Sequence, residues 1–152
     1  IKASESGKIK NGFHDGTWKG YSNRLNCSYT ELYEDGKFVS GVSIDSNNIE
    51  YQYKEMFSKP KPKKGIDDFY RYMGNNMRRT KEADINKISG KSYLTFVVDK
   101  NGSIDEIKII KGLGYGLDEE AITTLKSYRN WIPGKMKGIN VRVMYSLPLT
   151  LK

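Results

Sequence analysis

The chain has 152 residues and a formal net charge of +8, from 26 Lys and Arg against 18 Asp and Glu. Its single cysteine excludes an internal disulfide and any multi-cysteine metal site, and no run of about 18 apolar residues could form a membrane-spanning helix. Hydrophobic residues make up only 37%, so this length predicts two small cores rather than one large core.

The sequence begins at Ile1, without an initiator Met, in a polar segment. We interpret it as a mature or truncated product from which a signal peptide or anchor is absent. The positive charge is spread over both halves of the chain. It favours acidic partners such as anionic lipid heads, cell-wall polymers or nucleic acid, without choosing among them.

Residues 7–56 contain a short internal repeat. Residues 15–20 read Asp-Gly-Thr-Trp-Lys-Gly, and residues 35–41 read Asp-Gly-Lys-Phe-Val-Ser-Gly. Asp-Gly is favoured in hairpin turns because Gly accepts positive φ. Tyr29, Glu31 and Tyr33 alternate with Thr30 and Leu32, which indicates a strand. The alternation continues on both sides of a turn at Ser46-Asn47-Asn48, through Val42, Ile44, Ile49, Tyr51 and Tyr53. We expect a small all-β antiparallel meander of about four to six strands.

This first segment resembles MORN-like repeats, on the stretches from Gly16 to Tyr21 and from Tyr33 to Phe38. The resemblance implies contacts with protein or lipid and no common chemistry. The alternative is that these aromatic residues only pack the sheet.

Residues 58–64 read Ser-Lys-Pro-Lys-Pro-Lys-Lys and predict a linker between two domains, 1–57 and 65–152. Alternating Pro disfavours helix and sheet, and the Lys charges repel one another, so we expect an extended, stiff segment.

Four elements are predicted after the linker. Apolar residues at helical spacing predict a helix from Ile66, and Asn101-Gly102 predicts the turn of a hairpin over 91–111. A second amphipathic helix begins at Leu117, with acidic residues in its first turn. Alternation over 141–147 predicts a last strand.

Five short motifs in this region carry a resemblance to a known family. They are Gly90-Lys91, Gly102-Ser103-Ile104, Leu117-Asp118-Glu119-Glu120-Ala121, Trp131-x-Pro133-Gly134, and the stretch from Val141 to Pro148. In this order they resemble the C-terminal domain of TonB, the periplasmic energy transducer of Gram-negative bacteria, in its Bacteroidetes-type form. The resemblance implies an α+β domain: a three-stranded antiparallel sheet with two helices on one face, here preceded by the meander.

The resemblance also implies a function. In the family the last strand lies at the edge of the sheet and pairs with the TonB box, a short peptide of outer-membrane transporters, to support energy-dependent uptake. An exposed edge offers unpaired N–H and C=O groups that an added strand satisfies. Carried over by position, the partner-binding residues are Val141, Arg142, Val143, Met144, Tyr145, Ser146 and Leu147. Pro148 lacks an N–H, so we expect it to cap the pairing region.

The sequence departs from the family pattern in two places. Residues 77–80 read Met-Arg-Arg-Thr where a Tyr-Pro pair is usual, and Asn140 stands where Pro commonly precedes the last strand. A long Pro-rich spacer and an N-terminal membrane helix are also missing from this chain, and inner-membrane proton-channel partners would act through such a missing region. The alternative function is a cell-envelope scaffold without transduction, and a homodimer could cover the last strand. Both hypotheses imply a periplasmic location.

No other motif favours chemistry. Gly112, Gly114 and Gly116 precede a helix but lack the full dinucleotide-binding pattern, and His14 is the only histidine. Asp118, Glu119 and Glu120 suit the positive end of a helix better than a catalytic carboxylate pair. We therefore expect no enzyme activity, no cofactor and no metal. Tyr among Lys and Arg could stack on bases, but we do not expect a nucleic-acid partner.

Overall fold

The structure is a computed structural model that describes residues 5–151, and it divides into two compact units. The first unit is the chain up to Ser58 together with Lys135–Asn140. The second unit is Lys59–Gly134 together with the chain from Val141 onward. The described residues form antiparallel sheets and three helices, which confirms the predicted α+β class.

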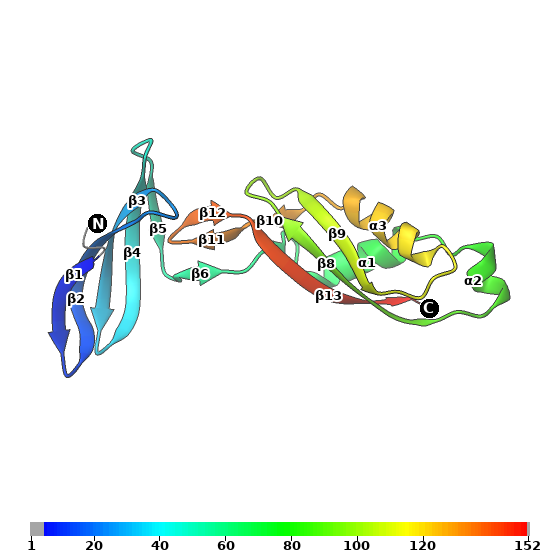
Figure 1. The fold of residues 1–152 in the computed structure, drawn as a ribbon, viewed down its shortest axis with the longest axis horizontal. Helices are drawn as coiled ribbons and strands as arrows, with labels where there is room; N and C mark the ends of the chain where they lie inside the picture. The colour runs from blue at the N-terminus through cyan, green and yellow to red at the C-terminus, as the bar shows by residue number, and fades with distance from the viewer. Residues whose placement is uncertain (1–4, 152) are drawn as a thin grey trace. The chain divides into compact units, whose positions relative to one another are not determined.

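The first unit is built on a five-stranded antiparallel meander in which each strand pairs with the next one along the chain (Figure 1). Its strands are β1 (Glu5–Lys10), β2 (Phe13–Ser22), β3 (Cys27–Glu34), β4 (Lys37–Asp45) and β5 (Glu50–Tyr53).

One of the two predicted Asp-Gly turns is confirmed. Asp35-Gly36 joins β3 to β4, with φ of 49° and 79°. The turn predicted at Asp15-Gly16 is wrong, because both residues lie within β2. Asn11-Gly12 makes the turn between β1 and β2 instead, with φ of 52° and 81°. Asn-Gly is at least as well suited as Asp-Gly to a turn that needs positive φ at both central residues.

A buried carboxylate lies among tyrosines on one face of this meander. Glu31 is only 1% exposed and accepts hydrogen bonds from Tyr53 Oη at 2.7 Å and Tyr33 Oη at 3.0 Å. The Lys137 ammonium lies 2.5 Å from Glu31 Oε1 and 3.7 Å from the centre of the Tyr29 ring. Lys137 forms the turn of a hairpin that comes from much later in the sequence, so this ion pair fixes that hairpin to the meander.

The hairpin consists of β11 (Gly134–Met136) and β12 (Ile139–Val141), and β11 pairs with β6 (Phe57–Ser58). The Pro- and Lys-rich segment continues from β6 into β7 (Lys61–Pro62), which pairs with β10 (Trp131–Ile132). The expectation that this segment avoids sheet is therefore wrong. Its prolines still exclude helix, but a two-residue ladder requires too few N–H groups for them to prevent it.

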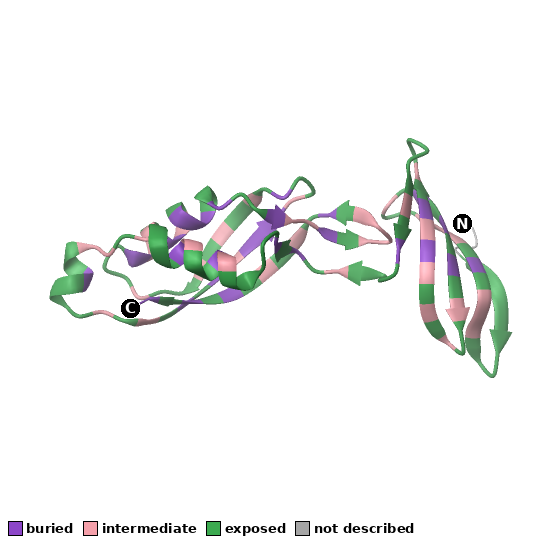
Figure 2. Cartoon of the chain, turned by 180° about the vertical axis from the view of Figure 1, so that it is seen from behind, coloured by how far each residue is buried: buried purple, intermediate pink, exposed green. Residues whose placement is uncertain are grey.

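The second unit contains a three-stranded antiparallel sheet in the order β13-β8-β9 and three helices. Buried and exposed residues alternate along β13, as Figure 2 shows. The elements are α1 (Ile66–Asn76), α2 (Lys81–Ile85), β8 (Gly90–Val98), β9 (Ile104–Lys111), α3 (Leu117–Ser127) and β13 (Val143–Leu151).

Trp131 is the centre of an aromatic cluster in the core of this unit. The rings of Phe69, Phe96 and Tyr145 lie with their centres 5.2–5.4 Å from the Trp131 ring. The backbone at Trp131 also approaches the β8–β9 turn closely. A Cβ on Gly102 would lie 2.6 Å from the Trp131 carbonyl oxygen, and Gly102 has φ of 82°, so this position requires glycine.

Replacing Lys137 with Met should destabilise the first unit by about 3 kcal/mol, because it leaves the Glu31 carboxylate buried without its cation. Urea unfolding can be measured by NMR. Signals from β3 report on the first unit, and signals from β8 report on the second. Lys135→Met, an exposed lysine of the same hairpin, should leave the β3 transition unchanged. If the β3 signals of Lys137→Met and Lys135→Met showed unfolding at the same urea concentration, this role of Lys137 would be contradicted.

Candidate partner-binding edge

β13 lies at an edge of its sheet. It pairs with β8 along its whole length, from Val143 opposite Val98 to Leu151 opposite Gly90. Within the part of the chain that the structure describes, no strand pairs with its other border (Figure 1). This border is therefore the candidate site.

The seven residues predicted to bind a partner are only partly on this strand. Residues 143–147 lie in β13, whereas Val141 ends β12 and Arg142 connects the two strands. β13 also extends beyond the predicted residues, to Leu151.

The side chains of β13 alternate between the core and the opposite face of the sheet. Leu147, Leu149 and Leu151 are at most 6% exposed, and they pack in the core with the helices. Met144, Ser146, Pro148 and Thr150 are exposed on the other face, and Met144 is 67% exposed. A partner on this border would therefore leave the hydrophobic core undisturbed.

Pro148 lies within β13, opposite Tyr93, and the strand continues through it. Pro148 therefore does not interrupt the pairing of β13 with β8. A proline fits an edge strand when its nitrogen faces away from the paired neighbour. The Pro148 carbonyl accepts a hydrogen bond from Tyr70 Oη at 3.1 Å, which places this carbonyl toward α1. At Pro148, the outer border thus lacks a donor and already has its acceptor engaged.

Backbone groups in a strand alternate between its two borders, so Met144 and Ser146 direct theirs to the same side as Pro148. Each of these two residues carries both an N–H and a C=O. The open part of the border is accordingly the stretch beside residues 143–147.

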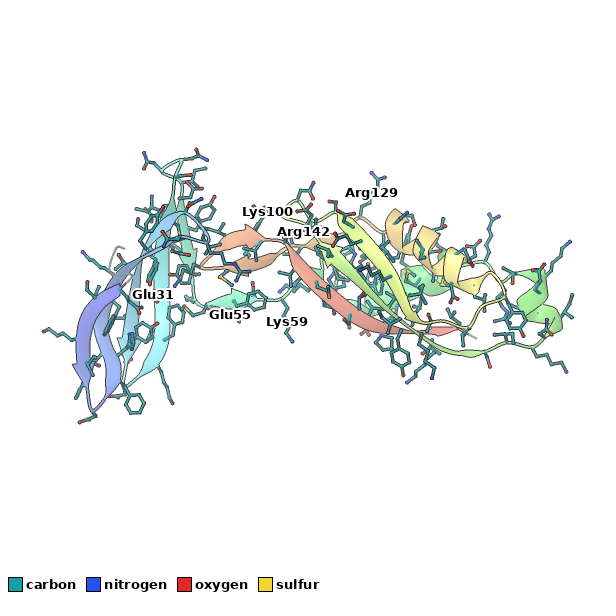
Figure 3. The ribbon with its side chains drawn as sticks, viewed as in Figure 1. Glu31, Glu55, Lys59, Lys100, Arg129 and Arg142 are labelled. Carbon is teal, nitrogen blue, oxygen red and sulfur yellow. The ribbon has the colours of Figure 1, made fainter. Side chains whose placement is uncertain are left out.

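Arg142, labelled in Figure 3, forms its ion pairs within its own chain. Its guanidinium lies 3.1 Å from Asp99 and 3.3 Å from both Asp105 and Glu106. These carboxylates belong to the β8–β9 turn and to β9, so the side chain crosses the sheet. Arg142 fixes the entry into β13, and its charge is engaged within the domain.

Tyr70 was not among the predicted site residues. It lies in α1, the helix predicted from Ile66, yet it is 37% exposed and its hydroxyl bonds to β13. No local pattern distinguishes a tyrosine whose hydroxyl reaches a distant strand from one that only packs.

The other candidate groups have structural roles. Asp118 accepts hydrogen bonds from the N–H groups of Leu113 and Gly114, both at 3.1 Å, and so closes the loop before α3. The His14 ring lies 3.8 Å from the Trp18 ring and its Nε2 3.6 Å from Glu5. Cys27 is buried, and burial raises the pKa of its thiol.

Among the described residues, no group of three or more His, Cys, Asp or Glu could hold a metal ion. No helix in residues 5–151 combines the length and the apolar character needed to cross a membrane.

Replacing Arg142 with Gln should lower the free energy of unfolding of the second unit only slightly, because exposed ion pairs contribute little each. The difference should shrink in high salt, which screens exposed charges. Urea unfolding at low and high NaCl measures it. Lys108→Gln, an exposed lysine of β9, is the control, and an Arg142→Gln effect that is independent of salt would contradict an electrostatic role.

Comparison with known proteins gives one family match. Residues 80–151, a little under half of the chain, match the family described as Gram-negative bacterial TonB protein C-terminal. A solved structure, the solution NMR structure of the TonB C-terminal domain of Helicobacter pylori, has 22% identity and a TM-score of 0.47, covering 57% of this chain and 91% of that one. No curated protein sequence matches. The region that contains β8, β9, α3 and β13 is thus similar to the TonB C-terminal family.

Proposed function

We propose that this chain is a periplasmic, non-enzymatic binding module that accepts the TonB box of an outer-membrane transporter along β13, in support of energy-dependent uptake. The observation that carries this proposal is the position of β13 at the edge of its sheet. The family match over residues 80–151 supports the choice of partner.

The geometry limits how strong such binding can be. An added strand beside residues 143–147 meets the N–H and C=O groups of Met144 and Ser146. Each new hydrogen bond contributes about 0.5–1.5 kcal/mol net, so these groups together contribute roughly 2–6 kcal/mol before ordering costs. Backbone pairing alone therefore gives weak binding, around micromolar at best once side-chain contacts are added.

The second candidate function is a cell-envelope scaffold that keeps this fold without transducing energy. Apolar side chains on the exposed face of the meander favour it, because Leu32 is 37% and Ile44 40% exposed on neighbouring strands. The MORN-like pattern of this segment supports contacts with protein or lipid. A bait lacking the meander would distinguish the two: a scaffold loses its envelope partners, whereas a docking module keeps its transporter.

Ser146→Pro should abolish peptide docking while leaving the fold intact. Proline removes the outward N–H of Ser146 and places its ring on the open border, whereas the β8 ladder does not use that N–H. We expect peptide affinity to fall at least about tenfold, measured by NMR titration with transporter-derived TonB-box peptides.

Ser146→Ala is the matched control, because it changes the side chain and keeps the N–H. Its affinity should equal that of the wild type. Docking along this border would be excluded if Ser146→Pro bound as tightly as Ser146→Ala, with both variants folded by their amide spectra.

A further inference from the structure

A groove lies beside the last residues of β13. It has a volume of about 760 Å³ and lies between α1, the segment after α1 and the end of the sheet. Its apolar lining is Met73, Met77, Leu117, Leu149 and Leu151. Three cationic residues also line it: Arg78, Arg79 and Lys91. No acidic residue in the described part of the chain lines the groove.

The groove begins where the open border of β13 stops. Tyr70 and Pro148 both line it, and they are the two residues that engage or remove the pairing groups at that point. A strand added beside residues 143–147 finds no donor at Pro148 and a carbonyl already bonded to Tyr70, so its hydrogen bonding is interrupted there. The chain that follows passes beside the groove.

The charges of the groove indicate what would occupy it. Arg79 is engaged within the domain, since it bonds Asp84 Oδ1 at 2.6 Å and the Ile88 carbonyl at 2.7 Å. Arg78 and Lys91 are exposed at the rim. An apolar floor with cations at its rim complements an apolar side chain that has a carboxylate next to it.

We propose that this groove binds an anchor of the partner peptide: an apolar side chain with an adjacent carboxylate, placed just beyond the stretch that pairs with β13. The proposal rests on strand addition as the proposed function. It assigns the groove a share of the affinity and specificity that backbone pairing cannot supply, because backbone groups do not discriminate between sequences.

Gly74 provides a way to test the groove without touching the core. It lies in α1 and lines the groove, and a Cβ at this position would meet no heavy atom within 4 Å. Gly74→Phe should therefore fill the groove, whereas Gly74→Ala adds only a methyl group. Neither change strains the helix, in which Ala and Phe are both better tolerated than Gly.

The probes are designed peptides titrated against the whole chain by NMR. The first is acetyl-Thr-Val-Thr-Val-Thr-amide, which can only pair. Two others add Gly-Leu-Asp at the C-terminal end or Asp-Leu-Gly at the N-terminal end, because an added strand can run in either direction. We expect one extended peptide to bind at least about tenfold more tightly than the short one, with shifts at residues 143–147 and at the Met77 methyl group.

The higher affinity of the extended peptide over the short one should be lost in Gly74→Phe and kept in Gly74→Ala. Replacing the peptide Asp with Asn should reduce the gain and its dependence on salt. Equal binding of short and extended peptides, with shifts confined to β13, would overturn the groove proposal and leave strand addition standing.

Three other outcomes would also overturn the anchor. Shifts in the groove with an unmoved β13 border would exclude strand addition as well, and so would the absence of binding by every peptide. A peptide-free dimer in sedimentation that Gly74→Phe dissociates would show that a second copy occupies the groove.

Discussion

The structure depends on a difference in hydrogen bonding between the two borders of one strand, β13. β13 satisfies its inner border through nine residues of pairing with β8 and presents its outer border without a partner strand in the described chain. Its leucines hold it against α1 and α3 by burial, so the strand does not need a second neighbour to stay in place. Strong packing on one face makes an open border compatible with a stable fold.

The C-terminal part of the chain contributes residues to both units. This organisation could not be predicted from local patterns. Residues 135–140 follow directly from the Trp131 region yet belong to the first unit, where Lys137 neutralises the buried Glu31. A buried ion pair of this kind contributes little net stability but is costly to break, so it favours one arrangement over its alternatives. The hairpin that carries Lys137 leads straight into the entry of β13, at Arg142.

Sequence patterns predicted elements wherever neighbouring residues determine them. The hairpin that turns at Asn101-Gly102 and the helix from Leu117 follow from turn chemistry and periodicity, and both are confirmed. The turn at Asp15-Gly16 failed because a nearby Asn-Gly pair satisfies the same backbone geometry. The ladder of Lys61–Pro62 with Trp131–Ile132 joins segments far apart in sequence, which no local signal reports.

The candidate site also combines features that neighbouring residues determine with features that depend on distant contacts. Alternation along the last strand located residues 143–147, but the limits of the open border depend on a tertiary contact, the hydroxyl of Tyr70 on the Pro148 carbonyl. An open edge also carries a risk of aggregation, which proteins reduce by making it short or by interrupting it with proline. Pro148 and Tyr70 restrict the border to a window of a few residues. Such a window is too short to hold a partner tightly by backbone pairing alone, so in the proposed complex side-chain contacts next to it would supply the rest of the affinity and nearly all of the selectivity.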